Sequence, residues 1–128
     1  AARAAAEREG LAATCRFERR DIFTLQDYPG AFDLLVEHTC FCAIDPRRRP
    51  EDVEAVATIL APGGTFLALF YPIGERPEEG PPFPSRREEI ERLFLAPGAP
   101  FSLVSARTPD DSIERRRGRE WLAILRRN

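Results

Sequence analysis

Two uninterrupted apolar runs constrain the fold of this chain more than any other feature. Leu34-Leu35-Val36 follows Phe32-Asp33, and Phe66-Leu67-Ala68-Leu69-Phe70 comes about thirty residues later. A strand with one solvated face alternates between apolar and polar residues, whereas continuous apolar strands are typical of sheets covered on both faces. The runs therefore predict two neighbouring, fully covered parallel strands.

A helix pattern separates the two runs. Pro50 suits the first helical position, and Glu51 and Asp52 complement the positive end of the helix dipole. One apolar stripe follows at helical spacing, formed by Val53, Val56, Ala57 and Leu60. Ala61-Pro62-Gly63-Gly64 then ends the helix and turns the chain into the next strand. Strand, helix and strand in this order predict a right-handed βαβ unit.

The residues before the first run predict one helix and one strand. Ala1 to Glu9 is rich in alanine, and Gly10 suits a helix C-terminus. This helix has no cap before it, as an arbitrary cut would leave it. Thr14 to Arg19 alternates between apolar and polar residues, which predicts a half-exposed strand near a sheet edge.

The residues after the second run predict a loop, a helix and a hairpin. The stretch from Tyr71 to Pro84 is rich in proline and glycine, so we expect a long loop. Ser85 and Glu88 have the spacing of a capping box at the start of a helix. Phe101–Ala106 and the solidly apolar Trp121–Leu125, joined by a polar loop, predict an antiparallel hairpin whose last strand is the inner one.

Charge and composition exclude several classes of function. The formal net charge is -2, and all 19 basic residues are arginine. The runs Arg47–Arg49 and Arg115–Arg117 are each balanced by nearby acids and lack aromatic neighbours for base stacking, so we expect no nucleic-acid partner. No apolar run approaches the roughly 20 residues that span a bilayer, so we expect no membrane partner.

The three cysteines indicate a reducing compartment. An odd number without a secretory leader predicts free thiols and a cytoplasmic protein. Cys40 and Cys42 would point to opposite faces of a strand, and no second ligand pair follows them. We therefore expect no metal site.

The segment that continues the first apolar run resembles a known family. The run Phe41-Cys42-Ala43-Ile44-Asp45-Pro46, together with Gly80-Pro81-Pro82-Phe83, resembles the thiopurine S-methyltransferase superfamily, best its halide and thiol methyltransferase branch. Leu60-Ala61-Pro62-Gly63-Gly64 stands where that family would have it, although many class I methyltransferases share it. The resemblance runs through nearly the whole chain.

The resemblance implies an α/β, Rossmann-like class I methyltransferase sheet with helices on both faces and a C-terminal antiparallel hairpin. The family's strand order is 3-2-1-4-5-7-6, and residues 1–128 would form one partial domain, from the helix after strand 2 to strand 7. The glycine-rich loop after strand 1 and the acid that ends strand 2 would lie upstream of Ala1. Thr14–Arg19 would then be strand 3 without its partner, and the edge of strand 4 would be bare. We therefore expect Cys15 to Arg19 to be detached, mobile or laid against strand 4.

The resemblance also implies candidate site residues. Asp21 and Ile22 match the pair that brackets the adenine of S-adenosylmethionine, although Asp21 could instead cap the next turn. His38 stands where the family has a Tyr or Arg that contacts the cofactor beside the methyl-transfer centre, at a strand end where open α/β sheets bind ligands. The expected pocket for the small-molecule acceptor is formed by Glu37, Phe41, Tyr71 and Phe83. Glu37 could equally be a capping acid, and Phe41 could equally belong to the core.

The implied reaction transfers a methyl group from S-adenosylmethionine to a soft nucleophile such as a thiol, a halide or a thiopurine-like acceptor. Such nucleophiles need no strong general base, so the site would mainly hold the reactants in line. We expect the complete protein to be a monomeric enzyme and this chain alone to be inactive. Two alternatives remain, a fragment of a nicotinamide-dependent oxidoreductase and a non-enzymatic truncated domain. An antiparallel last strand would argue against the oxidoreductase.

Overall fold

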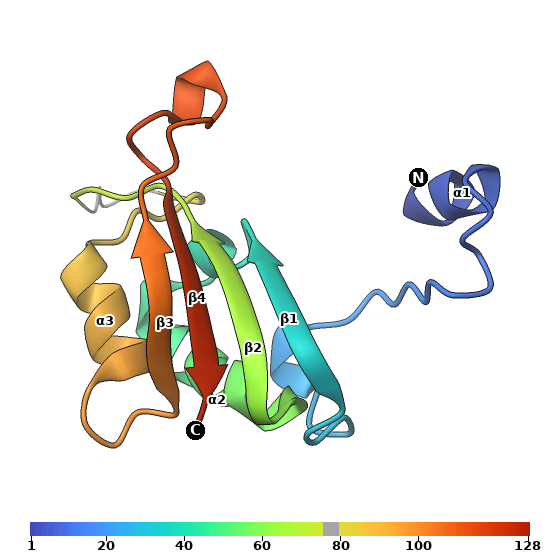
Figure 1. Cartoon of the computed structure of the whole chain (residues 1–128), viewed down its shortest axis with the longest axis horizontal. Helices are drawn as coiled ribbons and strands as arrows, with labels where there is room; N and C mark the ends of the chain where they lie inside the picture. The colour runs from blue at the N-terminus through green and yellow to red at the C-terminus, as the bar shows by residue number, and fades with distance from the viewer. Residues whose placement is uncertain (76–79) are drawn as a thin grey trace.

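A mixed four-stranded sheet forms the centre of the computed structural model, which describes residues 1–75 and 80–128. The strands are β1 (Phe32–His38), β2 (Leu60–Phe70), β3 (Phe101–Arg107) and β4 (Trp121–Arg127). They lie in the order β1-β2-β4-β3 (Figure 1). β1 and β2 are parallel, whereas β4 is antiparallel to both of its neighbours. This confirms the predicted pair of parallel strands and the inner position of the last strand, in the order that the resemblance implies for strands 4, 5, 7 and 6.

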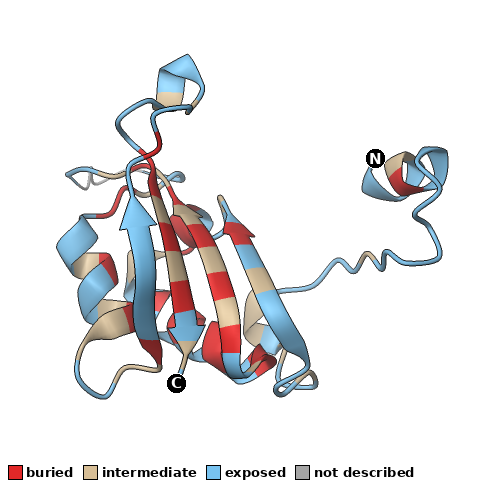
Figure 2. Cartoon of the chain, in the orientation of Figure 1, coloured by how far each residue is buried: buried red, intermediate tan, exposed pale blue. Residues whose placement is uncertain are grey.

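Helices α2 (Arg49–Ile59) and α3 (Arg87–Leu95) cover one face of the sheet, behind the strands in Figure 1. Side chains along β2 and β4 alternate between buried and intermediate, as Figure 2 shows. The buried set faces the helices because successive side chains of a strand point to opposite faces. The expected α/β sheet is confirmed, whereas no described helix packs over its other face, where helices were also expected.

Aromatic side chains dominate the core between the sheet and the helices. Phe94 of α3 is fully buried and lies 5.6 to 5.9 Å, between ring centroids, from four other phenylalanines. These are Phe41, Phe66, Phe70 and Phe101. Val53 and Val56 of α2 and Trp121, Ala123 and Leu125 of β4 also belong to this cluster. The apolar stripe predicted for α2 therefore packs on the sheet.

β1 is much less covered than its sequence predicted. Leu34 is 56% and Val36 62% exposed, because both side chains point to the uncovered face at the edge of the sheet. Among the described strands, β1 pairs only with β2. Its other side borders an apolar groove of about 530 Å³ whose walls include Leu25, Tyr28 and Phe32. The prediction of a bare apolar edge is confirmed, and the prediction of coverage on both faces is wrong for this strand.

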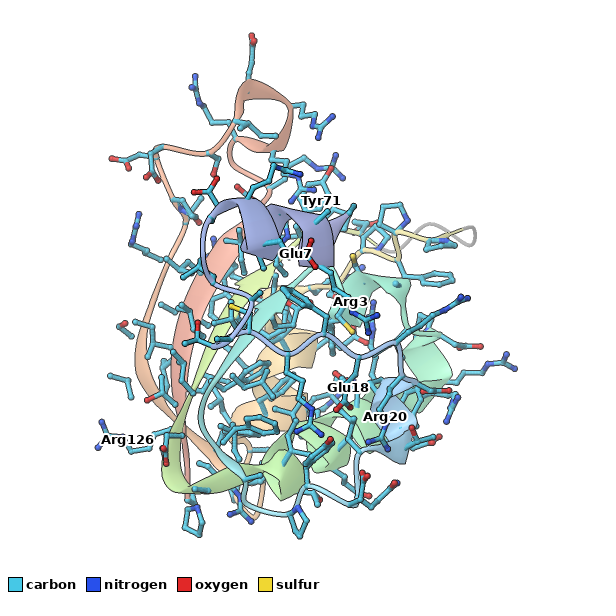
Figure 3. The ribbon with its side chains drawn as sticks, turned by 90° about the vertical axis from the view of Figure 1, so that its right-hand side faces the viewer. Arg3, Glu7, Glu18, Arg20, Tyr71 and Arg126 are labelled. Atoms are coloured by element: carbon cyan, nitrogen blue, oxygen red, sulfur yellow. The ribbon has the colours of Figure 1, made fainter. Side chains whose placement is uncertain are left out.

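The N-terminal helix α1 (Ala2–Arg8) lies away from the sheet at the end of an extended segment (Figure 1). Thr14–Arg19 was predicted to be a strand, but it forms none, because no described strand lies beside it to supply the ladder. Side-chain contacts hold the C-terminal end of this segment instead. The Tyr28 hydroxyl donates to Glu18 Oε1 over 2.8 Å. Arg20 lies 3.8 Å from Glu18, and Figure 3 shows the two side by side. The segment forms no strand pairing with β1, and its residues Arg16 and Glu18 border the same groove as Leu34 and Val36 of β1.

Two predicted boundaries differ from the structure. Ser85 and Glu88 form no capping box, because α3 begins at Arg87 after Arg86, and the Ser85 backbone is instead engaged with Pro72 and Gly74. β2 begins at Leu60 rather than at Phe66, since Phe32 of β1 pairs with Leu60 across an irregularity in register. The remaining short elements are the 3-10 turns η1 (Ile22–Thr24), η2 (Phe41–Ala43), η3 (Pro46–Arg48) and η4 (Glu114–Arg116).

None of the helices in the described part of the chain is long and apolar enough to cross a membrane. Within residues 1–75 and 80–128, no three His, Cys, Asp or Glu side chains gather as a metal ion would require.

Candidate functional site

The carboxyl ends of the two parallel strands meet at one rim of the sheet. His38 is the last residue of β1 and pairs in register with Leu69, and Tyr71 directly follows β2. The loop between β3 and β4 rises beside this rim, and Figure 3 shows Tyr71 at the same end of the sheet. Parallel α/β sheets bind their ligands outside the carboxyl ends of their strands. The rim is therefore the candidate site.

Arg116, in the loop between β3 and β4, connects His38 to Tyr71. Its Nη1 atom lies 3.4 Å from His38 Nε2, although 78 residues separate the two along the chain. Its guanidinium carbon lies 4.3 Å from the centroid of the Tyr71 ring, a cation–π distance. Nη1 also lies 3.6 Å from an oxygen of the buried carboxylate Glu120. Stacking and ion pairing from two sides fix the guanidinium at the rim.

Arg116 and His38 can share a hydrogen bond in one direction only. An arginine only donates hydrogen bonds, so a hydrogen bond between Arg116 Nη1 and His38 Nε2 requires the tautomer whose Nε2 is the acceptor. The Nε2 atom then faces Arg116, and the ring must turn away before Nε2 can contact a ligand.

A cavity of about 460 Å³ opens beside this contact, on the uncovered face of the sheet. Leu69 and Leu122, neighbours in register on β2 and β4, form its apolar floor, and His38 borders it. The other wall is the loop between β3 and β4, from Pro109 to Glu120. Three arginines and two carboxylates line the cavity, namely Arg107, Arg115, Arg116, Asp111 and Glu120. The lining therefore has a formal excess of one positive charge.

Glu37 supports the turn that follows His38. Its Oε1 atom accepts hydrogen bonds from the backbone N–H groups of Cys40 (2.6 Å) and Phe41 (2.8 Å). Burial raises the pKa of this carboxyl, although the two N–H donors oppose the rise. Thr39, within the turn, has a φ of 62°, an unfavourable conformation for a β-branched residue. Glu37 therefore acts as a cap in this structure, one of the two roles considered for it, and does not line the cavity beside His38.

A second acid lies buried close to Glu37. Asp52 of α2 is 3% exposed, and burial and the Glu37 charge raise its pKa to about 7, against the opposing charge of Arg49. Burial, together with Asp52 and Glu37, also raises the pKa of the Cys40 thiol to about 11. Cys40 therefore stays a thiol near neutrality and is no ready nucleophile.

Of the expected pocket residues, neither Phe41, Tyr71 nor Phe83 lines the cavity beside His38, although Tyr71 contacts Arg116 of its wall. Phe41 is 3% exposed and packs edge-on against Phe70 in the core, with ring centroids 5.3 Å apart. The Phe83 N–H donates to the Cys42 carbonyl over 2.7 Å, and its ring covers Gly80, where a Cβ atom would lie 2.4 Å from the ring. Phe83 therefore anchors the long loop to the turn after β1.

Asp21 and Ile22 also lie apart from this cavity. Asp21 Oδ1 accepts from the Phe23 N–H over 2.9 Å and so caps η1, as the alternative interpretation proposed. Ile22 borders a separate cavity of about 240 Å³ between η1 and α2, with Glu54 and Thr58 on its other side. Their proposed contact with adenine stays a prediction.

Sequence reasoning missed Arg116 and Glu120. Nearby acids balance the charge of the Arg115–Arg117 run, and this pattern is typical of a solvated surface. Only the spacing of Arg116 and Glu120, which suits an ion pair across one turn, was a signal for the pair. Nothing in the sequence indicated that Arg116 would meet His38.

Comparison with known proteins identifies the family. The family described as Thiopurine S-methyltransferase matches residues 3–123. Probable thiol methyltransferase 2 of Arabidopsis thaliana and thiocyanate methyltransferase 1 of Brassica oleracea are each 33% identical over 106 residues. Each alignment covers 83% of this chain and 45% of the relative. The chain thus spans about half the length of the curated relatives that it matches.

Solved structures show the same fold. A SAM-dependent methyltransferase of Methanosarcina mazei has a TM-score of 0.75 at 15% identity, covering 98% of this chain and 75% of that one. A Burkholderia thailandensis 1,6-didemethyltoxoflavin-N1-methyltransferase, solved with S-adenosylhomocysteine bound, has a TM-score of 0.67 at 19% identity, covering 98% of this chain and 55% of that one. The sheet is therefore that of a Rossmann-like methyltransferase, and with a family match over residues 3–123 the chain belongs to the thiopurine S-methyltransferase family.

Proposed function

We propose that this chain forms the acceptor side of an enzyme that transfers a methyl group from S-adenosylmethionine to a small soft nucleophile, a thiol, a halide or a thiopurine-like compound. The carrying observation is the rim cluster of His38, Tyr71 and Arg116 at the carboxyl ends of two parallel strands. Relatives named as thiol and thiocyanate methyltransferases support this class of acceptor. The antiparallel β4 and the family match argue against a nicotinamide-dependent oxidoreductase.

The residues present fit the acceptor side of such a site. The cavity beside His38 has an apolar floor and cationic walls, which suits a small polarisable anion. When bound, the cofactor supplies a methyl group activated by a sulfonium centre. The task of this chain is then to hold the nucleophile in line, about 3 Å from the reacting carbon, and away from water. Leu69 and Leu122 exclude water from the floor of the cavity, and Arg116, stacked on Tyr71, forms part of one wall.

Calorimetry with S-adenosylhomocysteine tests whether cofactor binding requires an upstream half in addition to this chain. We expect no measurable binding to the 128-residue chain and micromolar binding to a protein that also carries an upstream half with a glycine-rich loop. The same longer protein should convert iodide to methyl iodide, measured by gas chromatography of the headspace. Cofactor binding without transfer to iodide, thiocyanate or any thiol would contradict the proposal. Absence of binding even in the longer protein would favour a non-enzymatic domain.

His38 is a candidate base for thiols that are protonated at neutral pH. In the longer protein, His38→Ala should reduce kcat with neutral thiols more than with iodide, because iodide carries no proton to remove. His38→Gln is the matched control, since its amide oxygen can still accept from Arg116 but cannot take up a proton. Equal losses with both acceptors in His38→Ala, or full thiol activity in His38→Gln, would remove the base role.

A further inference from the structure

We infer that Asp52 is a positioning residue: with Glu37 it forms a buried acid pair that holds the turn after His38 in place only while the pair keeps a proton. The turn comprises residues 39–41 and leads from the end of β1 into η2. The effect of the pair on turnover rests on the proposed methyl transfer, whereas the pH dependence of the turn does not.

Asp52 interrupts the buried face of α2. It precedes Val53 and lies four residues before Val56, and all three side chains are buried. Residues three and four apart share one face of a helix, so Asp52 occupies a place where packing favours an apolar side chain. Glu51 is exposed in the same first turn and already complements the helix dipole. A buried second acid is not needed for that purpose, and such departures from local rules are typical of functional positions.

Glu37 is the side chain that fixes the turn. Its Oε1 atom accepts hydrogen bonds from the backbone N–H groups of both Cys40 and Phe41. Thr39 has a positive φ, which a β-branched residue adopts only when its surroundings impose it. Phe41 anchors the far end of the turn in the core. The path of the chain directly after His38 therefore depends on the Glu37 carboxyl.

The surroundings of the acid pair disfavour two negative charges. Both side chains are buried, and the Glu37 Oε2 atom has no hydrogen-bond partner among the described residues. A charged oxygen in such a place is costly. Two neighbouring carboxyls in an apolar environment do not both ionise readily. The charged and titratable groups that interact with the pair from the neighbouring elements are His38, Cys40, Arg49 and, through its ion pair with Arg49, Glu89.

The acid pair loses a proton as the pH rises through neutrality. Burial and the Glu37 charge raise the pKa of Asp52 to about 7, and burial raises the pKa of Glu37. A raised pKa in the folded chain means that the proton is held below about pH 7 and released above it. The new negative charge then repels the carboxylate that caps the turn, and water enters between α2 and the turn to solvate it. The turn is therefore fixed in acid and loosened in alkali.

NMR of the isotopically labelled 128-residue chain tests this coupling. The Asp52 carboxyl carbon and the amide protons of Cys40 and Phe41, followed from pH 5 to pH 9, should shift with one shared midpoint near pH 7. The backbone order parameters of the two amides should fall from about 0.85 at pH 5.5 toward about 0.6 at pH 8.5. Histidine side chains titrate in the same range, so the series is repeated in His38→Gln, where the transition should persist.

Asp52→Asn should abolish the transition and keep the turn rigid at both pH values, because an amide carries no charge. The matched control Glu51→Gln, on the exposed side of the same helical turn, should retain the transition. Order parameters that stay constant through the Asp52 midpoint, or an Asp52 carboxyl that titrates near 3.8, would overturn the inference in the wild-type chain alone. Persistence of the transition in Asp52→Asn would overturn it as well.

The pH profile of the longer protein with iodide tests the positioning role, since iodide has no proton to remove. In wild type, kcat should fall about tenfold between pH 6 and pH 8.5, as the rim loses its alignment, and in Asp52→Asn it should stay level. Coincident profiles of the two proteins would refute the positioning role. If the longer protein transfers no methyl group while the NMR transition is present, the pH dependence of the turn stands and the proposed function fails.

Discussion

The buried carboxyl of Asp52 should make the stability of this chain fall as pH rises. Its pKa is about 7 in the folded chain against an ordinary value of 3.8, because burial and Glu37 disfavour its charge. The folded state therefore binds more protons than the unfolded state between these two values. Unfolding free energy should decline from about pH 4 to about pH 7 and level off above. A difference of one in pKa between the folded and unfolded states changes the unfolding free energy by ~1.4 kcal/mol. The structure relaxes partly around the charge, so we expect a full decline of about 2–4 kcal/mol.

Asp52→Asn isolates this effect because it removes the ionisation and conserves shape. At pH 8 the variant should be about 2–4 kcal/mol more stable than wild type, the cost of ionising the buried carboxyl. The measurement is urea unfolding at several pH values between 5 and 8. The unfolding free energy of Asp52→Asn should still decline slightly with pH, since burial also raises the pKa of Glu37.

Glu51→Gln is the matched control, one residue away on the same helix. Glu51 is exposed, and its hydrogen bond from Arg48 lowers its pKa, so its own contribution to stability is lost only in acid. The unfolding free energy of Glu51→Gln should therefore change with pH between 5 and 8 as it does in wild type. A wild-type stability that is flat or rises over this range would refute the reasoning. So would a slope in Asp52→Asn equal to that of wild type.

Three further changes test the turn, the core and the sheet edge. Thr39→Gly should stabilise the chain by about 1 kcal/mol, because glycine adopts the positive φ of 62° without steric cost; a loss of stability in urea unfolding would contradict this. Phe94→Ala should cost about 3–5 kcal/mol, since the ring is fully buried among four phenylalanines; a cost under about 1 kcal/mol by the same assay would show a loose core. Val36→Lys should change stability by less than about 0.5 kcal/mol, because the side chain is 62% exposed, while reducing any concentration-dependent association in sedimentation velocity by charging the free edge. Unreduced association in that variant would place the self-contact elsewhere.

Local periodicity accounts for the elements that sequence reasoning predicted correctly. Val53 and Val56 of α2 and the continuous apolar strands β1 and β2 depend on residues two to four positions apart, which the sequence displays directly. The order of the strands followed from burial along the hairpin together with the family resemblance, and the structure confirms it. The segment Thr14–Arg19 shows the limit of such patterns. It has the alternation of a strand, but a strand exists only when a neighbour supplies its hydrogen bonds.

The sequence by itself thus determined the parallel βαβ unit, the antiparallel ending and the family. Only the tertiary structure decided which side chains share the rim. It separated Phe41, which joins the core, from Tyr71, which meets Arg116, and it brought Arg116 to His38 across 78 residues. The physical reason is that secondary structure follows from short-range spacing, whereas the path of the loop between β3 and β4 follows from the pairing of distant strands and the burial of Glu120.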